Sequence, residues 1–302
     1  MGHFDGQVAV VTGAGGGLGM EYALLLAAQG AKVVVNDYGG DTSGNPGTPA
    51  MAEGVVKQIQ DAGGIAVADG HDVATSGADI INTALESFGS LHVVINNAGI
   101  AGGGAFDEIS LDDYDRMLAI HMGGTLAVSR AAWPVFRNQG YGRIVNTSSA
   151  SVFGLPGTSA YITAKAGVFG LTRALSHDGR DIGVKVNAVM PSAFSRLTSR
   201  SPEFAPIMSA GFPTKKAAPF VCALATRDVA CTGETFVVGG GRAARVVLGT
   251  VPGLHDISSI DDCLARFGEA LSLDGLYVPD DAVHEVIYEC QEIGLDLSKF
   301  SP

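Results

Sequence analysis

Residues 10–30, VVTGAGGGLGMEYALLLAAQG, decide the fold of this chain. They join the end of a β-branched run to an apolar helix through Gly13, Gly17 and Gly19. Free backbone N–H groups and the helix dipole at such a helix start can hold a pyrophosphate, and glycine lets the backbone approach it closely. The alternative is a glycine-rich turn that binds nothing. The position of the glycines between strand and helix favours a phosphate-binding loop.

Helical patterns alternate with short β-branched runs from this stretch to about residue 240. The alternation is typical of an α/β fold, a doubly wound seven-stranded parallel sheet with helices on both faces, known as the Rossmann fold. Ligands bind such sheets at the carboxyl ends of the strands, so the residues that follow each run are candidate site residues. The seven predicted strands cover residues 7–12, 31–37, 64–69, 91–97, 142–148, 184–189 and 234–240.

The pattern changes after Gly241, where the spacing of apolar residues predicts two amphipathic helices around Leu264 and Ile287. This tail has too little apolar material to form a core of its own. We therefore predict a nucleotide-binding domain over residues 1–241 and a short helical C-terminal extension over residues 242–302 that packs on the same domain.

Composition narrows the classes of partner. The net charge of −12 argues against nucleic acid or an anionic membrane as the main partner, because either needs a basic surface. Four cysteines lie far apart and suggest neither a metal site nor a disulfide framework. The N-terminus resembles no signal peptide and no apolar run is long enough to span a membrane, so the cytoplasm is the expected location.

Two aspartates follow predicted strands. Asp37 ends the second strand, where a carboxylate can accept hydrogen bonds from both hydroxyls of an adenosine ribose and repel a 2′-phosphate, which favours NAD over NADP. A turn-forming role is the alternative. Asp72, in the segment GHDV after the third strand, can meet the adenine or can cap a helix.

Tyr161 and Lys165 lie four residues apart at the start of an apolar helix. This spacing places both side chains on one face of the helix, where an ammonium can favour the ionised phenol. A phenol with an ordinary pKa of about 10 could thereby act as an acid/base near neutral pH. The alternative is a core tyrosine beside a lysine that reaches the solvent.

Taken together, these motifs resemble those of the short-chain dehydrogenase/reductase family across residues 5 to about 240. The resemblance implies that Tyr161 is the acid/base and that Lys165 binds the nicotinamide ribose and lowers the pKa of the tyrosine. A serine would orient the substrate carbonyl. The implied cofactor-binding residues are Thr12, Gly13, Gly17, Leu18, Gly19, Asp37, Asp72, Val73, Asn97, Ala98, Gly99, Tyr161, Lys165 and Pro191.

Two positions depart from the family pattern. Members usually place the serine 13 residues before the tyrosine, which selects Ser148, whereas the end of the segment GRIVNTSS matches best with Ser149. Choosing Ser149 leaves one residue fewer than usual between the serine and the tyrosine. We prefer Ser149, because such a deletion is absorbed more easily in the loop after the strand than within the strand. His121 stands where the family commonly has asparagine, and it can hold a water in a proton relay or pack as a neutral side chain.

A narrower resemblance rests on the segments VVVNDYGGD, RAAWPVF, YGRIVNTSSAS, MPSAFSRLT and VVGGGRAARVV. They are similar to those in the dehydrogenase domains of peroxisomal multifunctional enzymes type two and their bacterial relatives. This implies NAD-dependent oxidation of a (3R)-hydroxyacyl-CoA, and the wider family resemblance implies a homodimer or homotetramer. A hydroxysteroid or another secondary alcohol is the alternative substrate.

The residues near the presumed substrate entrance leave this choice open. Basic side chains there can meet CoA phosphates or form ordinary surface, and apolar ones can line a steroid cleft or pack a lid. The basic residues are Arg196, Arg200, Lys215, Lys216, Arg242 and Arg245, and the apolar ones are Phe194, Phe204, Ile207, Met208, Phe212 and Phe220.

Two other classes of function have weaker support. A nucleotide-binding protein without turnover has no need of an acid/base tyrosine beside a serine and a lysine. A serine hydrolase is disfavoured because the segment GTSAY lacks the closing glycine of a nucleophile elbow.

Overall fold

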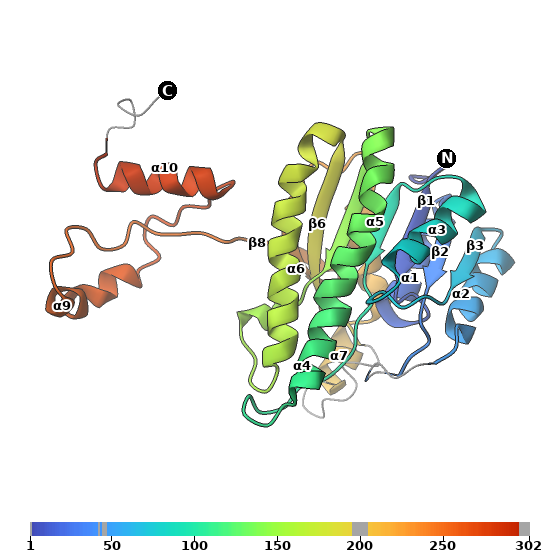
Figure 1. Ribbon diagram of the computed structural model, residues 1–302, viewed down its shortest axis with the longest axis horizontal. Coiled ribbons are helices and arrows are strands. Elements are labelled where there is room, and N and C mark those ends of the chain that lie inside the picture. Colours follow the sequence, from blue (N-terminus) through green and yellow to red (C-terminus); the bar gives the residue numbers. More distant parts are fainter. Residues whose placement is uncertain (1, 42, 44–46, 195–204, 296–302) are drawn as a thin grey trace. The chain divides into compact units, whose positions relative to one another are not determined.

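A parallel sheet with one added edge strand forms the centre of the molecule. The computed structural model describes residues 2–41, 43, 47–194 and 205–295. The strand order is β3-β2-β1-β4-β5-β6-β7-β8 (Figure 1). The strands are β1 (Val8–Thr12), β2 (Lys32–Asn36), β3 (Ile65–Asp69), β4 (Val93–Asn96), β5 (Gly142–Thr147), β6 (Val184–Pro191), β7 (Thr235–Gly239) and β8 (Arg242–Val246).

The seven predicted strands are all present and pair in parallel, which confirms the predicted fold class. The sheet has eight strands rather than seven, because β8 follows β7 after two glycines and extends the edge of the sheet. Its sequence, RAARV, contains one β-branched residue and mostly exposed side chains, so it carries little of the pattern that marks a buried strand.

Helices cover both faces of the sheet, as the alternating pattern predicts. On one face lie α1 (Gly17–Ala28), α2 (Ala50–Asp61) and α8 (Ala218–Ala223), and on the other α3 (Gly77–Phe88), α5 (Gly124–Gln139) and α6 (Ser159–Asp178). Each face has its own apolar core, with Leu26 and Val33 fully buried in one and Ile80 and Val94 in the other. Shorter helices are α4 (Leu111–Leu118) and α7 (Ala205–Gly211).

The order of strands positions the site. β1 lies between β2 and β4, so the chain leaves β1 toward one side of the sheet and later crosses to the other. A ligand-binding crevice forms outside the carboxyl ends of strands at such a reversal. The glycine loop after β1 therefore meets the segments that follow β2 and β4.

The chain divides into two compact units, residues 1–245 and 246–302. The second contains α9 (Ile260–Ala270) and α10 (Ala282–Glu292), the two helices that the apolar spacing predicts. Ser259 and Asp281 cap them with side-chain oxygens that accept backbone N–H groups. Among the helices that the structure describes, none is long and apolar enough to cross a bilayer.

Candidate active site

A pocket at the carboxyl edge of the sheet begins at the glycine loop between β1 and α1. Gly13, Gly16, Gly17 and Leu18 line it on this side. The first turn of α1 has no side-chain cap and no acidic residue, so its backbone N–H groups and the positive end of the helix dipole are available to an anion. These features fit the pyrophosphate of a dinucleotide.

Two glycines of the loop are required by geometry. Gly13 has a φ of +63°, a left-handed conformation that side chains rarely adopt. A Cβ on Gly19 would lie 2.3 Å from the Gly13 carbonyl oxygen and 2.6 Å from Asn97 Nδ2. The loop therefore packs against its neighbours with no room for a side chain at residue 19.

Asp37 connects the loop to the end of β2. Its Oδ2 accepts a hydrogen bond from the Gly15 N–H at 2.8 Å, and its Oδ1 accepts one from the Gly39 N–H at 2.8 Å. The side chain is nearly buried but still lines the pocket. Each carboxylate oxygen retains a second lone pair, so the aspartate can hold the loop and accept from a ribose as well.

Thr12 and Asn97 brace the ends of the central strands beneath the pocket. Thr12 Oγ1 accepts from the backbone N–H groups of Asn97 and Ala98 at 3.0 and 3.1 Å. Asn97 Nδ2 donates to the carbonyl oxygens of Thr12 and Gly13 at 2.9 and 3.1 Å. Both side chains thus fix the backbone of the glycine loop relative to β4.

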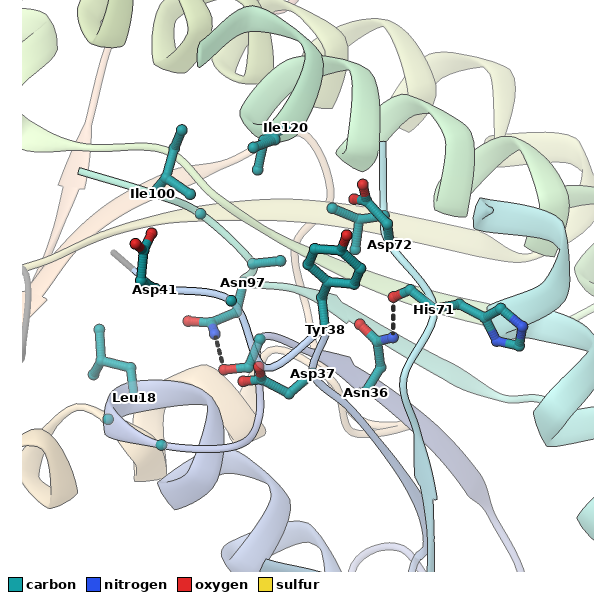
Figure 2. A pocket seen from close by; sticks show the side chains of 17 residues that line it. Leu18, Asn36, Asp37, Tyr38, Asp41, His71, Asp72, Asn97, Ile100 and Ile120 are labelled. Atoms are coloured by element: carbon teal, nitrogen blue, oxygen red, sulfur yellow. Dashed lines mark hydrogen bonds between the residues drawn. The ribbon is translucent and has the colours of Figure 1, made fainter. Parts of the chain in front are cut away.

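Segments after β2 and β3 complete the far end of the pocket. Figure 2 shows Asp37, Tyr38 and Asp72 around it. Asp72 Oδ1 accepts from the Ala74 N–H at 2.9 Å, so it also stabilises a turn at that strand end. Asn36 Nδ2 donates to the carbonyl oxygen of His71 at 2.9 Å, which holds this segment beside β2.

A group of buried side chains lies beyond the inner wall of the pocket, around Tyr161. Lys165 Nζ lies 5.7 Å from the centre of the Tyr161 ring and donates to the Thr147 carbonyl oxygen at 2.6 Å. Burial lowers the pKa of Lys165 to about 7. Burial also raises the pKa of Tyr161, and a hydrogen bond with Ser149 partly opposes this rise.

The expected lowering of the Tyr161 pKa by Lys165 is therefore wrong for this structure. The pKa of the phenol is raised, because loss of hydration outweighs the hydrogen bond that favours the phenolate. Helical spacing correctly places the two side chains together, but it carries no information about burial.

The two adjacent serines differ in what they contact. Ser148 is buried, and its Oγ donates to the Lys165 carbonyl oxygen at 2.8 Å. Ser149 is partly exposed, and it is the serine whose side chain lowers the pKa of Tyr161, against the larger effect of burial. Neighbouring residues in extended backbone point to opposite sides, so only one of them can face the tyrosine.

His121 packs beside Tyr161 from a π-helical turn, residues Ala119–Gly123. The two rings meet edge to face with centroids 5.1 Å apart. His121 Nε2 lies 3.0 Å from the Ile100 carbonyl oxygen, and burial lowers the pKa of the imidazole well below its usual value. The histidine is therefore neutral at physiological pH.

The pocket gathers most of the predicted cofactor residues. Its lining includes Gly13, Gly17, Leu18, Asp37, Asp72, Val73, Asn97, Ala98 and Gly99. The other predicted site residues lie outside this lining, namely Thr12, Gly19, Ser148, Ser149, Tyr161, Lys165, His121 and Pro191. Gly99 and Ile100 connect the two groups, because both line the pocket and both approach the His121 ring. Pro191 ends β6, paired with Val238.

Sequence reasoning missed several lining residues, including Tyr38, His71, Ile100 and Ile120. Tyr38 and His71 were open to prediction, because each directly follows or nearly follows the end of a predicted strand. Ile120 comes from the π-helical turn and had no such signal.

The predicted entrance residues are only partly within the described chain. Arg196, Arg200 and Phe204 lie outside the described residues. Lys215, Lys216 and Arg242 are exposed, whereas Arg245 forms a two-point ion pair with Glu234 at 2.6 and 2.8 Å. Phe220 packs against Phe236 in an edge-to-face contact.

Comparison with known proteins gives concordant matches. The family model for short chain dehydrogenases matches residues 7–203. A Mycobacterium tuberculosis protein named as a short-chain type dehydrogenase/reductase is 44% identical over 276 residues, which cover 89% of this chain and 95% of that protein. Peroxisomal multifunctional enzyme type 2 of Mus musculus is 45% identical over 196 residues, which cover 65% of this chain and 26% of the enzyme.

A solved structure adds a match in three dimensions. Carveol dehydrogenase from Mycobacterium avium, in complex with NAD, has a TM-score of 0.72 and 27% identity, covering 80% of this chain and 99% of that one. The chain thus spans nearly the whole of one bacterial relative but about a quarter of the mouse multifunctional enzyme.

Proposed function

This chain belongs to the short-chain dehydrogenase family and is one of its oxidoreductases; from this premise we propose that it interconverts a secondary alcohol and a ketone with NAD. The observation that carries the proposal is the grouping of Ser149 and Lys165 around Tyr161: Ser149 opposes the rise of the phenol pKa, and Lys165 Nζ lies 5.7 Å from the ring centre. These groups lie behind a pocket that fits a dinucleotide. A binding protein without turnover has no use for this arrangement.

In the direction of alcohol oxidation, Tyr161 Oη as the phenolate takes the proton of the substrate hydroxyl. Ser149 Oγ–H donates to the same substrate oxygen and holds it near the phenol. NAD, when bound, would supply the acceptor for the hydride of the hydroxyl-bearing carbon, so a ketone, NADH and protonated Tyr161 would be the products. In reverse, Tyr161 returns the proton to the developing alkoxide.

Lys165 and His121 shape the setting of this proton transfer. The Lys165 amine donates to the Thr147 carbonyl oxygen, which fixes its position, and we assign it to the nicotinamide ribose. His121 is neutral and packs on the Tyr161 ring, so we assign it a positioning role. Its Nδ1 is buried without a partner among the described residues and can hold a water.

We assign NAD rather than NADP as the preferred cofactor. The carboxylate of Asp37 stands at the end of β2, where it would repel a 2′-phosphate. The carveol dehydrogenase that resembles this chain was solved with NAD. The glycine loop, Asp37 and the segment Asn97 to Gly99 would hold the cofactor.

The substrate we propose is a (3R)-hydroxyacyl-CoA. The support is the narrower resemblance to multifunctional enzymes type two and a basic group at the carboxyl edge of the sheet. Lys215 and Lys216 follow β6, Arg242 follows β7, and the Lys216 side chain approaches Gly241 beside Arg242. Such exposed cations suit the phosphates of CoA. A hydroxysteroid remains the second candidate, because Phe194 and Ile207 expose apolar surface after β6.

The test measures NADH formation when the full chain and NAD meet (3R)-hydroxyacyl-CoA, (3S)-hydroxyacyl-CoA and a 17-beta-hydroxysteroid in parallel. We expect turnover on the (3R) thioester alone. Turnover on the steroid alone would contradict the proposed substrate but not the proposed alcohol oxidation. NAD binding without turnover on any alcohol would contradict both proposals. We expect Ser149→Ala to lose turnover, and Ser148→Ala to retain much more of it.

The proposed assembly rests on the family resemblance only. We propose a homodimer or homotetramer, which light scattering would measure, with a monomer as the contradicting result. We also propose a cytoplasmic location, whereas the names of several relatives refer to the peroxisome. The division into a nucleotide-binding domain over residues 1–241 and a C-terminal extension over residues 242–302 remains our proposal for the domain organisation.

A further inference from the structure

We infer that Ser151 is a positioning residue that makes Ser149 a hydrogen-bond donor toward the reacting oxygen. The inference rests on the proposed function, because it concerns the serine assigned to the substrate oxygen. Ser151 belongs to a single 3₁₀ turn, residues Ala150–Phe153, that begins directly after Ser149. The sequence motifs assign Ser151 no role.

Ser151 makes two hydrogen bonds to one oxygen. Its backbone N–H donates to Ser149 Oγ at 3.2 Å, and its own hydroxyl donates to the same Oγ at 3.0 Å. A serine hydroxyl has two acceptor lone pairs and one proton. Ser151 therefore occupies the accepting capacity of Ser149 and leaves the Ser149 proton as its remaining hydrogen-bonding function.

The direction of donation matters for the chemistry. Ser149 acts on Tyr161 and on the substrate oxygen by donating its proton, since the species that gain charge there are the phenolate and the alkoxide. A hydroxyl that accepts a hydrogen bond becomes a stronger donor, because consecutive hydrogen bonds polarise one another. Ser151, two residues after Ser149, therefore stabilises the Tyr161 phenolate through the hydroxyl of Ser149.

The same contacts fix the orientation of Ser149. As the N-cap of the 3₁₀ turn, Ser149 has an extended backbone and an Oγ that accepts the Ser151 N–H. A rotation of the Ser149 side chain away from this rotamer would break the cap and the second bond together. The catalytic hydroxyl is thus preorganised by a local turn.

Three variants separate this role from simple loosening of the loop. Ser151→Ala removes the hydroxyl but keeps the backbone N–H, and Ser151→Thr keeps both donors. Thr158→Ala is the matched control, because Thr158 Oγ1 donates to the Leu155 carbonyl oxygen in the same loop and does not bond Ser149. NADH binding, followed by fluorescence, confirms that each variant is folded.

For Ser151→Ala we expect kcat for alcohol oxidation to fall about threefold to tenfold, the effect of one neutral hydrogen bond, with the dissociation constant for NADH unchanged. The rise of kcat with pH should move to higher pH, since the phenolate has lost support. Ser151→Thr should restore both the rate and the pH profile, and Thr158→Ala should keep them.

Two results would overturn the inference while leaving the proposed function intact. One is a Ser151→Ala enzyme with the rate and pH profile of the parent. The other is an equal loss in Thr158→Ala, which would indicate a structural effect of the loop. If the parent enzyme oxidises no alcohol with NAD, or if Tyr161→Phe retains full turnover, the proposed function fails and the inference falls with it.

Discussion

The cofactor half of the site is built mostly from main-chain groups, whereas the catalytic half is built from side chains, of which Lys165 and His121 are buried. At the glycine loop, an uncapped helix start and the carboxylate of Asp37 face an accessible pocket. Around Tyr161, Lys165 and His121 are nearly inaccessible to solvent and their pKa values are displaced by burial.

This difference separates binding from chemistry. The backbone of the glycine loop binds the cofactor only if neighbouring atoms leave it enough space, and it depends little on the identity of nearby side chains. Substitutions in the loop should therefore change cofactor affinity. Buried titratable groups depend on hydration and hydrogen bonding, so changes there should act on the chemical step. The four predictions below test this separation, from the largest expected effect to the smallest.

Removal of the Tyr161 hydroxyl should have the largest effect. In Tyr161→Phe the acid/base is lost, and we expect kcat to fall by about a thousandfold or more. The dissociation constant for NADH should stay within a factor of about two, because the loop is untouched. Single-turnover kinetics and fluorescence titration measure the two quantities, and substantial residual turnover would remove Tyr161 from the mechanism.

A change at Asp37 should alter cofactor choice. We expect Asp37→Ser to reduce the ratio of kcat/KM for NAD to that for NADP by about 10-fold to 100-fold, since a like charge opposite the 2′-phosphate is removed. Asp72 lines the same pocket, so Asp72→Asn is the control, and it should leave the ratio of kcat/KM for NAD to that for NADP unchanged. An unchanged ratio in Asp37→Ser would mean that another group excludes NADP.

A single methyl group in the glycine loop should weaken binding. The Cβ of Gly19→Ala would meet the Gly13 carbonyl oxygen and Asn97, so we expect the dissociation constant for NADH to rise roughly tenfold as the loop shifts. Gly54→Ala in α2 is the matched control, because a Cβ there meets nothing within 4 Å. The control should bind normally and gain about 0.5–1 kcal/mol of stability. Normal NADH affinity in Gly19→Ala would show that the loop tolerates the shift.

The smallest effect concerns stability and follows from Lys165. Unfolded lysine keeps its proton up to about pH 10.5, while the folded protein releases it above a pKa of about 7. Between these two values the unfolded state therefore binds more protons than the folded state. The free energy of unfolding accordingly decreases as the pH falls from 10.5 toward 7.

In Lys165→Met this penalty disappears. We expect the midpoint temperature of unfolding to rise by roughly 3 °C at pH 7 relative to the parent, and the gain to shrink as the pH approaches 10. Turnover should fall at the same time, as expected for a destabilising group that serves the chemistry. Scanning calorimetry at several pH values provides the measurement, and a difference that does not vary with pH would contradict the assigned burial.

Much of the site was predictable because its elements are local. The glycine loop, Asp37 and the pair Tyr161 and Lys165 are recognisable from spacing alone, and the structure places each on the expected element. The eighth strand was not predictable, since its exposed residues lack a buried pattern.

The choice between Ser148 and Ser149 shows where spacing fails. Both follow the same strand, and a shift of one residue reverses which of them faces Tyr161. The contacts decide: Ser148 Oγ bonds α6, and Ser149 Oγ receives the bonds of Ser151. No pattern within the segment contains this information, because α6 lies apart from it in the sequence.

By itself, the sequence determined the α/β class, the strand order along the chain and the types of residue at each strand end. These depend on hydrophobic periodicity and on glycine, whose effects act over a few neighbouring residues. Only the tertiary structure decided which serine meets Tyr161, that His121 is neutral, and that burial raises rather than lowers the pKa of the phenol. Burial arises from segments that are distant in the chain, and hydration of a charge depends on all of them at once.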